Sequence, residues 1–258
     1  MKKTKFYHPA LLLIFFILAN SIASNIAKAQ DETTVYTNID FNKVLPERVN
    51  EYLNLEGKLW KPIQQEHVKA GGILGWNVFR VWFTGTGSSY NYAVMELYPK
   101  YENMAFVYND DIITKVHPGI NEDKLMDDTY HAREIVKAQS AVRIAMISPD
   151  TKKAPSKYAI VTYLDVKKSN VTEFEKNIND VAIPLMREQM KAEYNYGWDL
   201  FKTILPTGDI VPYQYISFEY INDMDMVVKT GGPDASKGME PRQVHRTELW
   251  ERVESLGE

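Results

Sequence analysis

The sequence contains no cysteine, and histidine is scarce, with five residues in 258. The lack of cysteine excludes disulfide bonds, thiolate metal sites, cysteine nucleophiles and the lipid-bearing cysteine of a bacterial lipoprotein. The chain has no H-x-x-x-H pair, no G-x-S-x-G motif and no run of acids at calcium-loop spacing. The glycine-rich stretch 84–89 joins two predicted strands, so it lacks the helix start that phosphate binding uses. These absences exclude the best-marked metal, nucleotide and hydrolase sites.

Basic clusters and long apolar runs are also missing from most of the chain. The formal net charge is -4, with 30 Lys and Arg against 34 Asp and Glu. An acidic chain without a basic cluster argues against nucleic acid and anionic membrane surfaces as partners. After the first 29 residues, no apolar segment is long enough to span a membrane.

Residues 1–29 are predicted to be a signal peptide. Three early lysines precede an apolar run from Ala10 to Ala19, which is too short to span a bilayer comfortably, and Ala27-Lys28-Ala29 fits the small-x-small cleavage rule. We expect a mature, soluble chain that begins at Gln30 and is periplasmic or extracellular. Its charge would be -8, because the removed segment carries four lysines and no acids. An uncleaved membrane anchor is the alternative.

One stretch of the chain occurs twice. Residues 51–80 align without a gap with residues 173–202, and eight of these thirty pairs are identical, against roughly two expected by chance. After a one-residue shift the match continues into the next strand. The pairs that matter most below are Gly75/Gly197, Trp76/Trp198, Arg80/Lys202, Tyr92/Tyr215 and Glu96/Glu219. The pattern predicts an internal duplication.

Hydrophobic periodicity gives the same order of elements in both halves. In the first half we expect strands at 33–44, 75–83, 90–98 and 140–147, and helices at 46–70 and 121–138. In the second half we expect strands at 158–166, 196–205, 213–221 and 244–253, with a long helix starting at 169 or 170 and a short one at 223–229. Pro62 lies inside the first helix, where a kink or break is expected.

Strand, helix, strand, strand, helix, strand is the order of a ferredoxin-like unit, a four-stranded antiparallel sheet with helices on one face. We therefore expect an α+β fold with one unit at 30–147, a linker at 148–156 and a second unit at 157–258. Each unit alone would leave one face of its sheet bare, so the two bare faces are expected to pack around a shared interior. Because this barrel closes within one chain, a monomer would suffice.

This order, together with the Gly-Trp strand, resembles the dimeric α/β-barrel superfamily, and within it the NIPSNAP-like group. The closer resemblance rests on Trp60-Lys61-Pro62-Ile63 and on a helix running through Glu66 to the Gly75-Trp76 strand. In that superfamily the two units usually come from two chains, whereas here both lie on one. The second copy departs from the pattern, because Ala182-Ile183-Pro184-Leu185 lacks the tryptophan.

Strand alternation suggests which side chains face the shared interior. Phe79, Val81, Ala93, Met95 and Leu97 form wholly apolar faces, which we expect to meet the helices. The opposite faces would then look inward and form a ligand site. Its candidate residues are Trp76, Arg80, Tyr92 and Glu96 in the first half and Trp198, Lys202, Tyr215 and Glu219 in the second.

Two interpretations of these inward charges are open, and both assume that the faces are assigned the right way round. Buried charges are costly unless they are paired. Arg80 with Glu96, and Lys202 with Glu219, would form two internal ion pairs that only hold the sheets in register. Alternatively, the same charges and tyrosines would orient a small ligand between aromatic walls.

The histidines give weaker signals. His67 continues the apolar stripe of the first helix, but its repeat partner is Gln189, which favours a polar contact at a helix end over a base or ligand. His117, His131 and His245 have no matched partner, and some barrels of the resembled superfamily bind haem, so any of them would serve as an axial ligand. The cofactor is otherwise unknown.

Three functions follow as expectations. The first is binding of a small, partly apolar molecule in the cavity between the units. The second, implied by the resemblance, is a cofactor-independent oxygenase, an isomerase or a haem-handling enzyme, with a tyrosine, glutamate or histidine as the acid–base group. The third is a structural or partner-binding module with a filled interior. The segment 101–117 and the loop 231–241 break the symmetry of the halves, and such insertions often carry function.

Overall fold

The structure is a computed structural model, and it describes residues 34–85, 87–105, 110–148, 155–193, 195–208, 211–229 and 241–257. The predicted signal peptide, most of the predicted linker and nearly all of the loop 231–241 lie outside the described residues. Residues 35–258 form one compact unit. Within the described residues, no helix is both long enough and apolar enough to cross a membrane.

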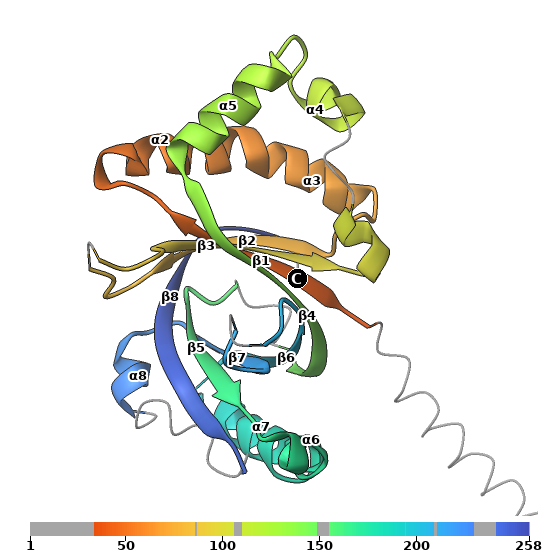
Figure 1. The fold of residues 1–258 in the computed structure, drawn as a ribbon, viewed down its shortest axis with the longest axis vertical. Helices are drawn as coiled ribbons and strands as arrows, with labels where there is room; N and C mark the ends of the chain where they lie inside the picture. The colour runs from red at the N-terminus through yellow and green to blue at the C-terminus, as the bar shows by residue number, and fades with distance from the viewer. Residues whose placement is uncertain are drawn as a thin grey trace, which may run out of the picture. The chain divides into compact units, whose positions relative to one another are not determined.

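Eight antiparallel strands make one closed barrel, so the expected α+β class is confirmed (Figure 1). The order of strands around the barrel is β1-β3-β2-β8-β5-β7-β6-β4. The strands are β1 (Tyr36–Lys43), β2 (Gly75–Val81), β3 (Tyr92–Tyr98), β4 (Glu134–Ile147), β5 (Tyr158–Asp165), β6 (Gly197–Leu205), β7 (Tyr215–Ile221) and β8 (Gln243–Gly257).

The two longest strands close the barrel. Strand β4 pairs with β1 on one side and with β6 on the other, and β8 pairs with β2 and with β5. Each therefore joins the first half of the chain to the second, and each contains register shifts that let it bend across the junction. The two halves share a single sheet for this reason.

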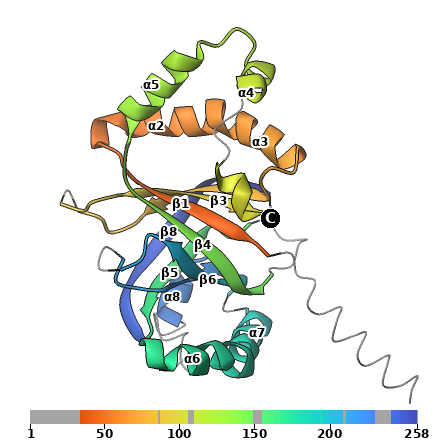
Figure 2. The same cartoon turned by 45° about the vertical axis from the view of Figure 1, so that its right-hand side comes forward.

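Two long composite helices lie against the outer face of the barrel, one on each half (Figure 2). The first comprises a 3₁₀ turn (Pro46–Arg48), α2 (Val49–Asn54), a π-helix (Leu55–Trp60) and α3 (Lys61–Lys69). The second comprises a 3₁₀ turn (Lys168–Asn170), α6 (Val171–Asn177), a π-helix (Ile178–Ala182) and α7 (Ile183–Lys191). The remaining helices are a 3₁₀ turn (Tyr101–Ala105), α4 (Asp110–Val116), α5 (Glu122–Ala132) and α8 (Asp225–Lys229).

The break expected at Pro62 takes the form of a π-helix. In each composite helix the π-helical segment ends just before a proline that stands at the start of the next α-helix, Pro62 in one and Pro184 in the other. Proline has no N–H and crowds the carbonyl four residues earlier. The wider π turn accommodates it without ending the helix.

The region before the fourth strand differs from the expectation. Asn121 caps α5, with its Oδ1 accepting from Lys124 N at 2.9 Å, as predicted. However, α5 ends at Ala132, and Arg133 already has extended backbone angles. Strand β4 then begins at Glu134, six residues before the predicted start at Ser140. The error arose because Glu134–Ala138 carries no clear alternation, and pairing with β1 decides its conformation.

The barrel interior is filled by side chains from all eight strands, and this overturns the predicted facing. Phe79, Val81, Ala93, Met95 and Leu97, expected to meet the helices, are buried inside the barrel. In the second half Phe201, Ile216 and Phe218 are also buried inside the barrel, and Trp250 lies fully buried among them. Alternation separates two faces but does not say which points inward. On β2 and β3 the wholly apolar face packs inward, whereas the helix layer tolerates polar side chains near its rim.

Candidate functional site

The eight predicted site residues come together in pairs on adjacent strands, but outside the barrel. Trp76 stands opposite Glu96, and Arg80 opposite Tyr92, in the β2–β3 register. The second half repeats this register, with Trp198 opposite Glu219 and Lys202 opposite Tyr215. Trp76 and Tyr92 pack under the first composite helix, and Trp198 and Tyr215 under the second. The structure therefore places these residues in two separate layers, one per half, and not in one shared cavity.

The two predicted ion pairs are wrong. Lys202 Nζ lies 2.7 Å from Glu175 Oε1 on α6, while Glu219 lies 3.5 Å from Asn195 Nδ2. Arg80 is exposed, and its guanidinium stacks over the Trp82 ring at 5.2 Å. The sequence pattern could not foresee these partners, because they come from helices and loops and not from the paired strand.

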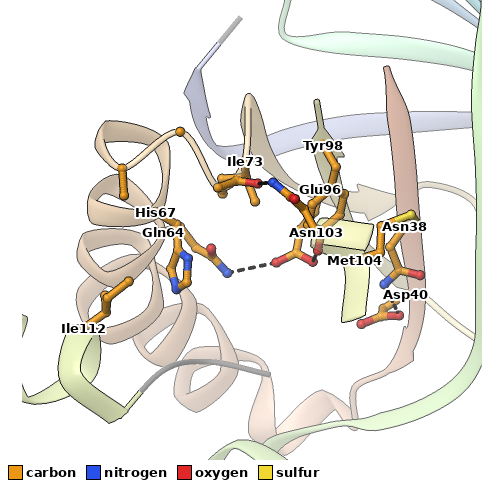
Figure 3. A pocket seen from close by; sticks show the side chains of 13 residues that line it. Asn38, Asp40, Gln64, His67, Ile73, Glu96, Tyr98, Asn103, Met104 and Ile112 are labelled. Carbon is orange, nitrogen blue, oxygen red and sulfur yellow. Dashed lines mark hydrogen bonds between the residues drawn. The ribbon is translucent and has the colours of Figure 1, made fainter. Parts of the chain in front are cut away.

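Glu96 is the predicted residue that borders a cavity. This pocket, of about 520 Å³, lies between α3 and the outer face of β1 and β3 (Figure 3). Its walls also include the end of the first composite helix, the 3₁₀ turn after β3 and the helix α4. The lining residues are Asn38, Asp40, Gln64, His67, Ala70, Gly71, Gly72, Ile73, Glu96, Tyr98, Asn103, Met104 and Ile112.

Hydrogen bonds hold the polar walls of this pocket in place. Gln64 Nε2 on α3 donates to Glu96 Oε1 on β3 at 3.0 Å, and Tyr98 also donates to Glu96 (Figure 3). Asn38 Nδ2 donates to Asp40 Oδ1 at 2.9 Å. The strand register explains the proximity, because Asn38 on β1 stands opposite Glu96 on β3. Helix and sheet together therefore fix two carboxylates at one end of the pocket.

Burial shifts the titration of two groups in the pocket. It raises the pKa of Asp40, an effect that the hydrogen bond from Asn38 and the charge of Arg133 partly oppose. It lowers the pKa of His67. His67 is therefore a neutral imidazole at pH 7, suited to accept a proton, and Asp40 holds a proton more readily than an exposed aspartate does.

A third acid lies close to the pocket, within the π-helix. Glu56 is 3% exposed, and Arg133 Nε lies 3.8 Å from its Oε1. Burial raises the pKa of Glu56 to about 7, with the charge of Arg133 opposing and the charges of Glu96 and Asp40 adding to the rise. The acids near the pocket are therefore electrostatically linked, so a charge gained by one affects the proton held by another.

The matching layer in the second half has different chemistry. Met186 occupies the repeat position of Gln64, and Gln189 that of His67. Trp198 Nε1 donates to Ser217 Oγ at 2.8 Å, and Gln189 accepts from Asn195 at 3.1 Å. Several polar groups of the protein thus bond one another there. The histidine and the paired carboxylates are features of the first half.

His67 has a more prominent place than its sequence pattern predicted. Among the other histidines considered as ligands, His117 Nε2 lies 3.0 Å from a backbone oxygen, His131 Nδ1 lies 2.7 Å from another, and His245 is exposed. His67 instead lines the pocket. The signal that could have identified it was the insertion after the third strand, because the 3₁₀ turn and α4 from that insertion supply Asn103, Met104 and Ile112 to the walls.

Among the described residues, no group of three or more His, Asp or Glu side chains is arranged to hold a metal ion. At the level of sequence, no family model and no curated protein matches the chain. Solved structures do match it.

A protein of Fusobacterium nucleatum subsp. nucleatum ATCC 25586, provisionally described as a monooxygenase, superimposes with a TM-score of 0.56 at 13% identity, over 89% of this chain and 96% of its own. A protein of Lactobacillus acidophilus NCFM with the same provisional description gives 0.52 at 13% identity, over 86% and 94%. A haem-binding protein of Thermus thermophilus gives 0.51 at 8% identity, over 86% and 93%.

This chain has the dimeric α/β-barrel fold. At such low identities the likeness concerns the fold and not the activity. The barrel fold that the resemblance implied is confirmed.

Haem, a cofactor that this fold suggests, fits the pocket poorly. His67 would be its axial ligand. However, the propionates of haem call for cations, and the described lining residues include neither Lys nor Arg. Two carboxylates, Asp40 and Glu96, and three side-chain amides occupy the walls instead. Haem carries two propionate charges. Its binding would remove water from Asp40 and Glu96 and would provide no cation to pair with either set of negative charges.

Proposed function

We propose that this protein binds a small, partly apolar molecule in the pocket between α3 and the outer face of β1 and β3. The observation that carries the proposal is a cavity of about 520 Å³ that brings together a histidine and two carboxylates. The expected cavity between the two halves is replaced by this one, since the barrel interior is occupied by buried side chains.

The two ends of the pocket favour an amphipathic ligand. Ile73 and Ile112 supply apolar surface toward the helix side, whereas Asp40 and Glu96 stand on the strands, with Met104 beside Asp40 (Figure 3). A ligand with an apolar body and a hydrogen-bond-donating end would therefore be held in one orientation. The carboxylates would accept from that end, and His67 would stand beside the body.

An enzymatic role is the second candidate, and the neutral His67 favours it. A cofactor-independent oxygenase or isomerase begins by removing a proton from its substrate, and a neutral imidazole near a substrate is suited to that task. Asp40, whose raised pKa lets it hold a proton near the same ligand, is suited to the opposite task. Two of the solved structures that share this fold are provisionally described as monooxygenases, which supports this role.

Duplication remains part of the proposal, as two tandem ferredoxin-like units of the NIPSNAP-like kind. Supporting it, strand neighbours run β4-β1-β3-β2 in one half and β8-β5-β7-β6 in the other. Both composite helices carry a π-helix before a proline. Inward positions of the two long strands also match at a constant offset, in the pairs Lys137/Arg246, Gln139/Glu248, Ala141/Trp250 and Arg143/Arg252.

Export is likewise proposed, on the strength of residues 1–29 alone. Expression of the full chain in a bacterial host, followed by fractionation and intact-mass measurement, tests it. A periplasmic or secreted product that begins at Gln30 is the expected result. A cytoplasmic product with residues 1–29 attached would contradict it. A monomer is the proposed oligomeric state, since the barrel closes within one chain.

Native mass spectrometry of protein purified from its source tests the binding function. We expect a retained small molecule in the wild type, and its loss in Glu96→Gln and His67→Gln. His131→Gln is the matched control, because His131 is exposed and contacts a backbone oxygen of its own helix. Retention by all variants would place the ligand elsewhere. Absence of any retained molecule, together with no thermal shift across a library of small phenols and amines, would favour a structural module.

A Soret band on adding haem provides the test for the haem alternative. We expect a flat spectrum, because of the acidic lining. A band that disappears in His67→Gln but persists in His131→Gln would establish haem binding in this pocket and overturn the argument from charge.

A further inference from the structure

The charges around the pocket between α3 and the outer face of β1 and β3 do not balance. Asp40 and Glu96 line this pocket, and Glu56, which is 3% exposed, interacts electrostatically with both. Arg133 is the cation that offsets them, through its charge on Asp40 and its position 3.8 Å from Glu56. Among the described residues, three carboxylates therefore depend on one guanidinium here.

The lysines of the neighbouring helices are engaged with other acids. Helices α3 and α4 carry Lys61, Lys69 and Lys115, and their ammonium groups lie within 2.6 Å of a carboxylate oxygen of Glu254 or Glu66. None of these lysines lines the pocket, and the histidine of the lining is neutral at pH 7 because burial lowers its pKa. The excess of negative charge therefore faces the cavity.

A proton takes up part of this excess. Burial raises the pKa of Glu56 to about 7, and the charges of Glu96 and Asp40 add to the rise that Arg133 opposes. Burial raises the pKa of Asp40 as well. Buried carboxylates take up protons where no cation compensates them. A cation that entered the pocket would favour their ionised forms and would be bound by them in turn.

The two lining carboxylates are placed to hold one donor group together. Asn38 stands opposite Glu96 in the β1–β3 register, and Asp40 follows two residues later, so both acids project from the same face of the sheet (Figure 3). Such diagonal neighbours lie about 7–8 Å apart at their bases. An ammonium group has three N–H donors and can bond both carboxylates. Gln64 and Tyr98 donate to Glu96 and fix its position.

We infer that the pocket takes a small organic cation, a primary amine with an aromatic or aliphatic body. This inference rests on the binding function proposed above and narrows it to one class of ligand. Asp40 and Glu96 hold the ammonium, within the field of Glu56. The body lies against Ile73 and Ile112, on the helix side of the pocket. The same charges repel a carboxylate or phosphate ligand, and a neutral alcohol loses most of the attraction.

Probes of one shape and different charge test the inference. At pH 7.5, 2-phenylethylamine is a cation, 2-phenylethanol is neutral and 3-phenylpropanoate is an anion; hexylamine, hexanol and heptanoate repeat the series with an aliphatic body. In isothermal titration of the purified protein, an amine should bind about tenfold tighter than its alcohol. The carboxylates should show no binding up to about 10 mM. This comparison uses the wild type alone, so it does not depend on any variant folding.

A matched pair of variants locates the ammonium. Asp40→Asn keeps the shape of the side chain and removes its charge, so it should weaken binding of the amine about tenfold and leave that of the alcohol within about twofold. Asp128→Asn is the control, because Asp128 is an acid on the surface of α5, 2.7 Å from Lys124. This variant should bind the amine like the wild type.

The outcomes distinguish failure of this inference from failure of the proposed function. Equal affinities for amine and alcohol, or tighter binding of a carboxylate, would overturn the inference and leave the binding function in place. An amine preference that persists unchanged in Asp40→Asn would also overturn it, because the ammonium would then lie elsewhere. If no probe binds, native mass spectrometry decides. A retained amine supports the inference, a retained neutral or anionic molecule overturns the inference alone, and no retained molecule overturns both.

Discussion

Arg143 Nη1 lies 3.6 Å from Asp199 Oδ1 inside the barrel, and the two side chains are only 6% and 10% exposed. Tyr220 Oη also donates to Asp199, at 2.8 Å. A buried ion pair was expected in this protein, but between residues of one hairpin. The pair of Arg143 and Asp199 instead joins β4 to β6, one of the contacts through which the two halves of the chain meet.

Arg143→Ala should therefore destabilise the protein far more than Arg80→Ala. Removing one partner of a buried pair leaves an uncompensated charge and costs about 3 kcal/mol or more. Arg80 is exposed and should cost less than about 0.5 kcal/mol. Urea unfolding of both variants measures the difference. Equal decreases in the free energy of unfolding would mean that Arg80 also stabilises the fold through a specific partner.

Glu219 should make stability fall as the pH rises. Burial raises its pKa to about 7 from the ordinary value of 4.5, so between these values the folded state binds the proton that the unfolded state has released. The stabilisation is complete below pH 4.5 and is lost as the pH approaches 7. Glu219→Gln, which cannot ionise, should be more stable than wild type at pH 8 by roughly 1–3 kcal/mol and similar at pH 4.5.

The matched control for Glu219→Gln is Glu188→Gln on α7, since Glu188 is an exposed acid paired with the exposed Lys191. Denaturant unfolding at pH 4.5, 6 and 8 gives the comparison. An unchanged pH slope in Glu219→Gln would show that Glu219 is ionised in the folded state at neutral pH. Glu56, whose pKa is also raised to about 7, should leave part of the slope in place.

His67 should make the stability of the fold decrease as the pH falls, the opposite of the effect of Glu219. Burial lowers its pKa below the ordinary value of 6.5, so the unfolded state binds the proton first as the pH falls. Stability should therefore drop below about pH 6.5 in the wild type. His67→Gln copies the residue found at the repeat position, Gln189, and should remove this loss. Unfolding measured at pH 5 and 7 tests it, with His131→Gln expected to behave like wild type.

Trp60 should fix α5 to the first composite helix. Its indole Nε1 donates to Thr129 Oγ1 at 2.9 Å, and the ring is 4% exposed. Trp60→Phe should lose this hydrogen bond and part of the packing, and amide exchange in 122–132 should accelerate more than in β5. Thr129→Val in the same background tests the pairing. If the two substitutions have fully additive effects, the hydrogen bond contributes nothing.

The position aligned with Trp60 in the second half of the chain lacks this contact. Ala182 stands at the matching position, and within the described residues no helix equivalent to α5 covers that face. The tryptophan, which supported the closer family resemblance, thus serves an element found in one half only. Its absence from the other half follows from the absence of a partner to pack against.

Periodicity, the repeat and the turn residues were enough to predict most of the architecture. The strand beginning at Gly75 starts where expected and the one at Gly197 starts one residue later, Asn121 caps its helix, and the helix type changes at Pro62, where a break was expected. These features are local, because alternation, capping and the missing proline N–H act within a few residues. The α+β class followed from their order.

The tertiary structure alone decided the facing of the strands and hence the location of the candidate site. Both faces of β2, β3, β6 and β7 are largely buried, one in the barrel interior and one under a helix, so hydrophobicity could not distinguish them. Closure of the sheet by β4 and β8 turned Phe79 inward and Glu96 outward. His67 and Asp40, distant in sequence, then met in one pocket because a helix and a strand lie side by side there, a relation that no local pattern encodes.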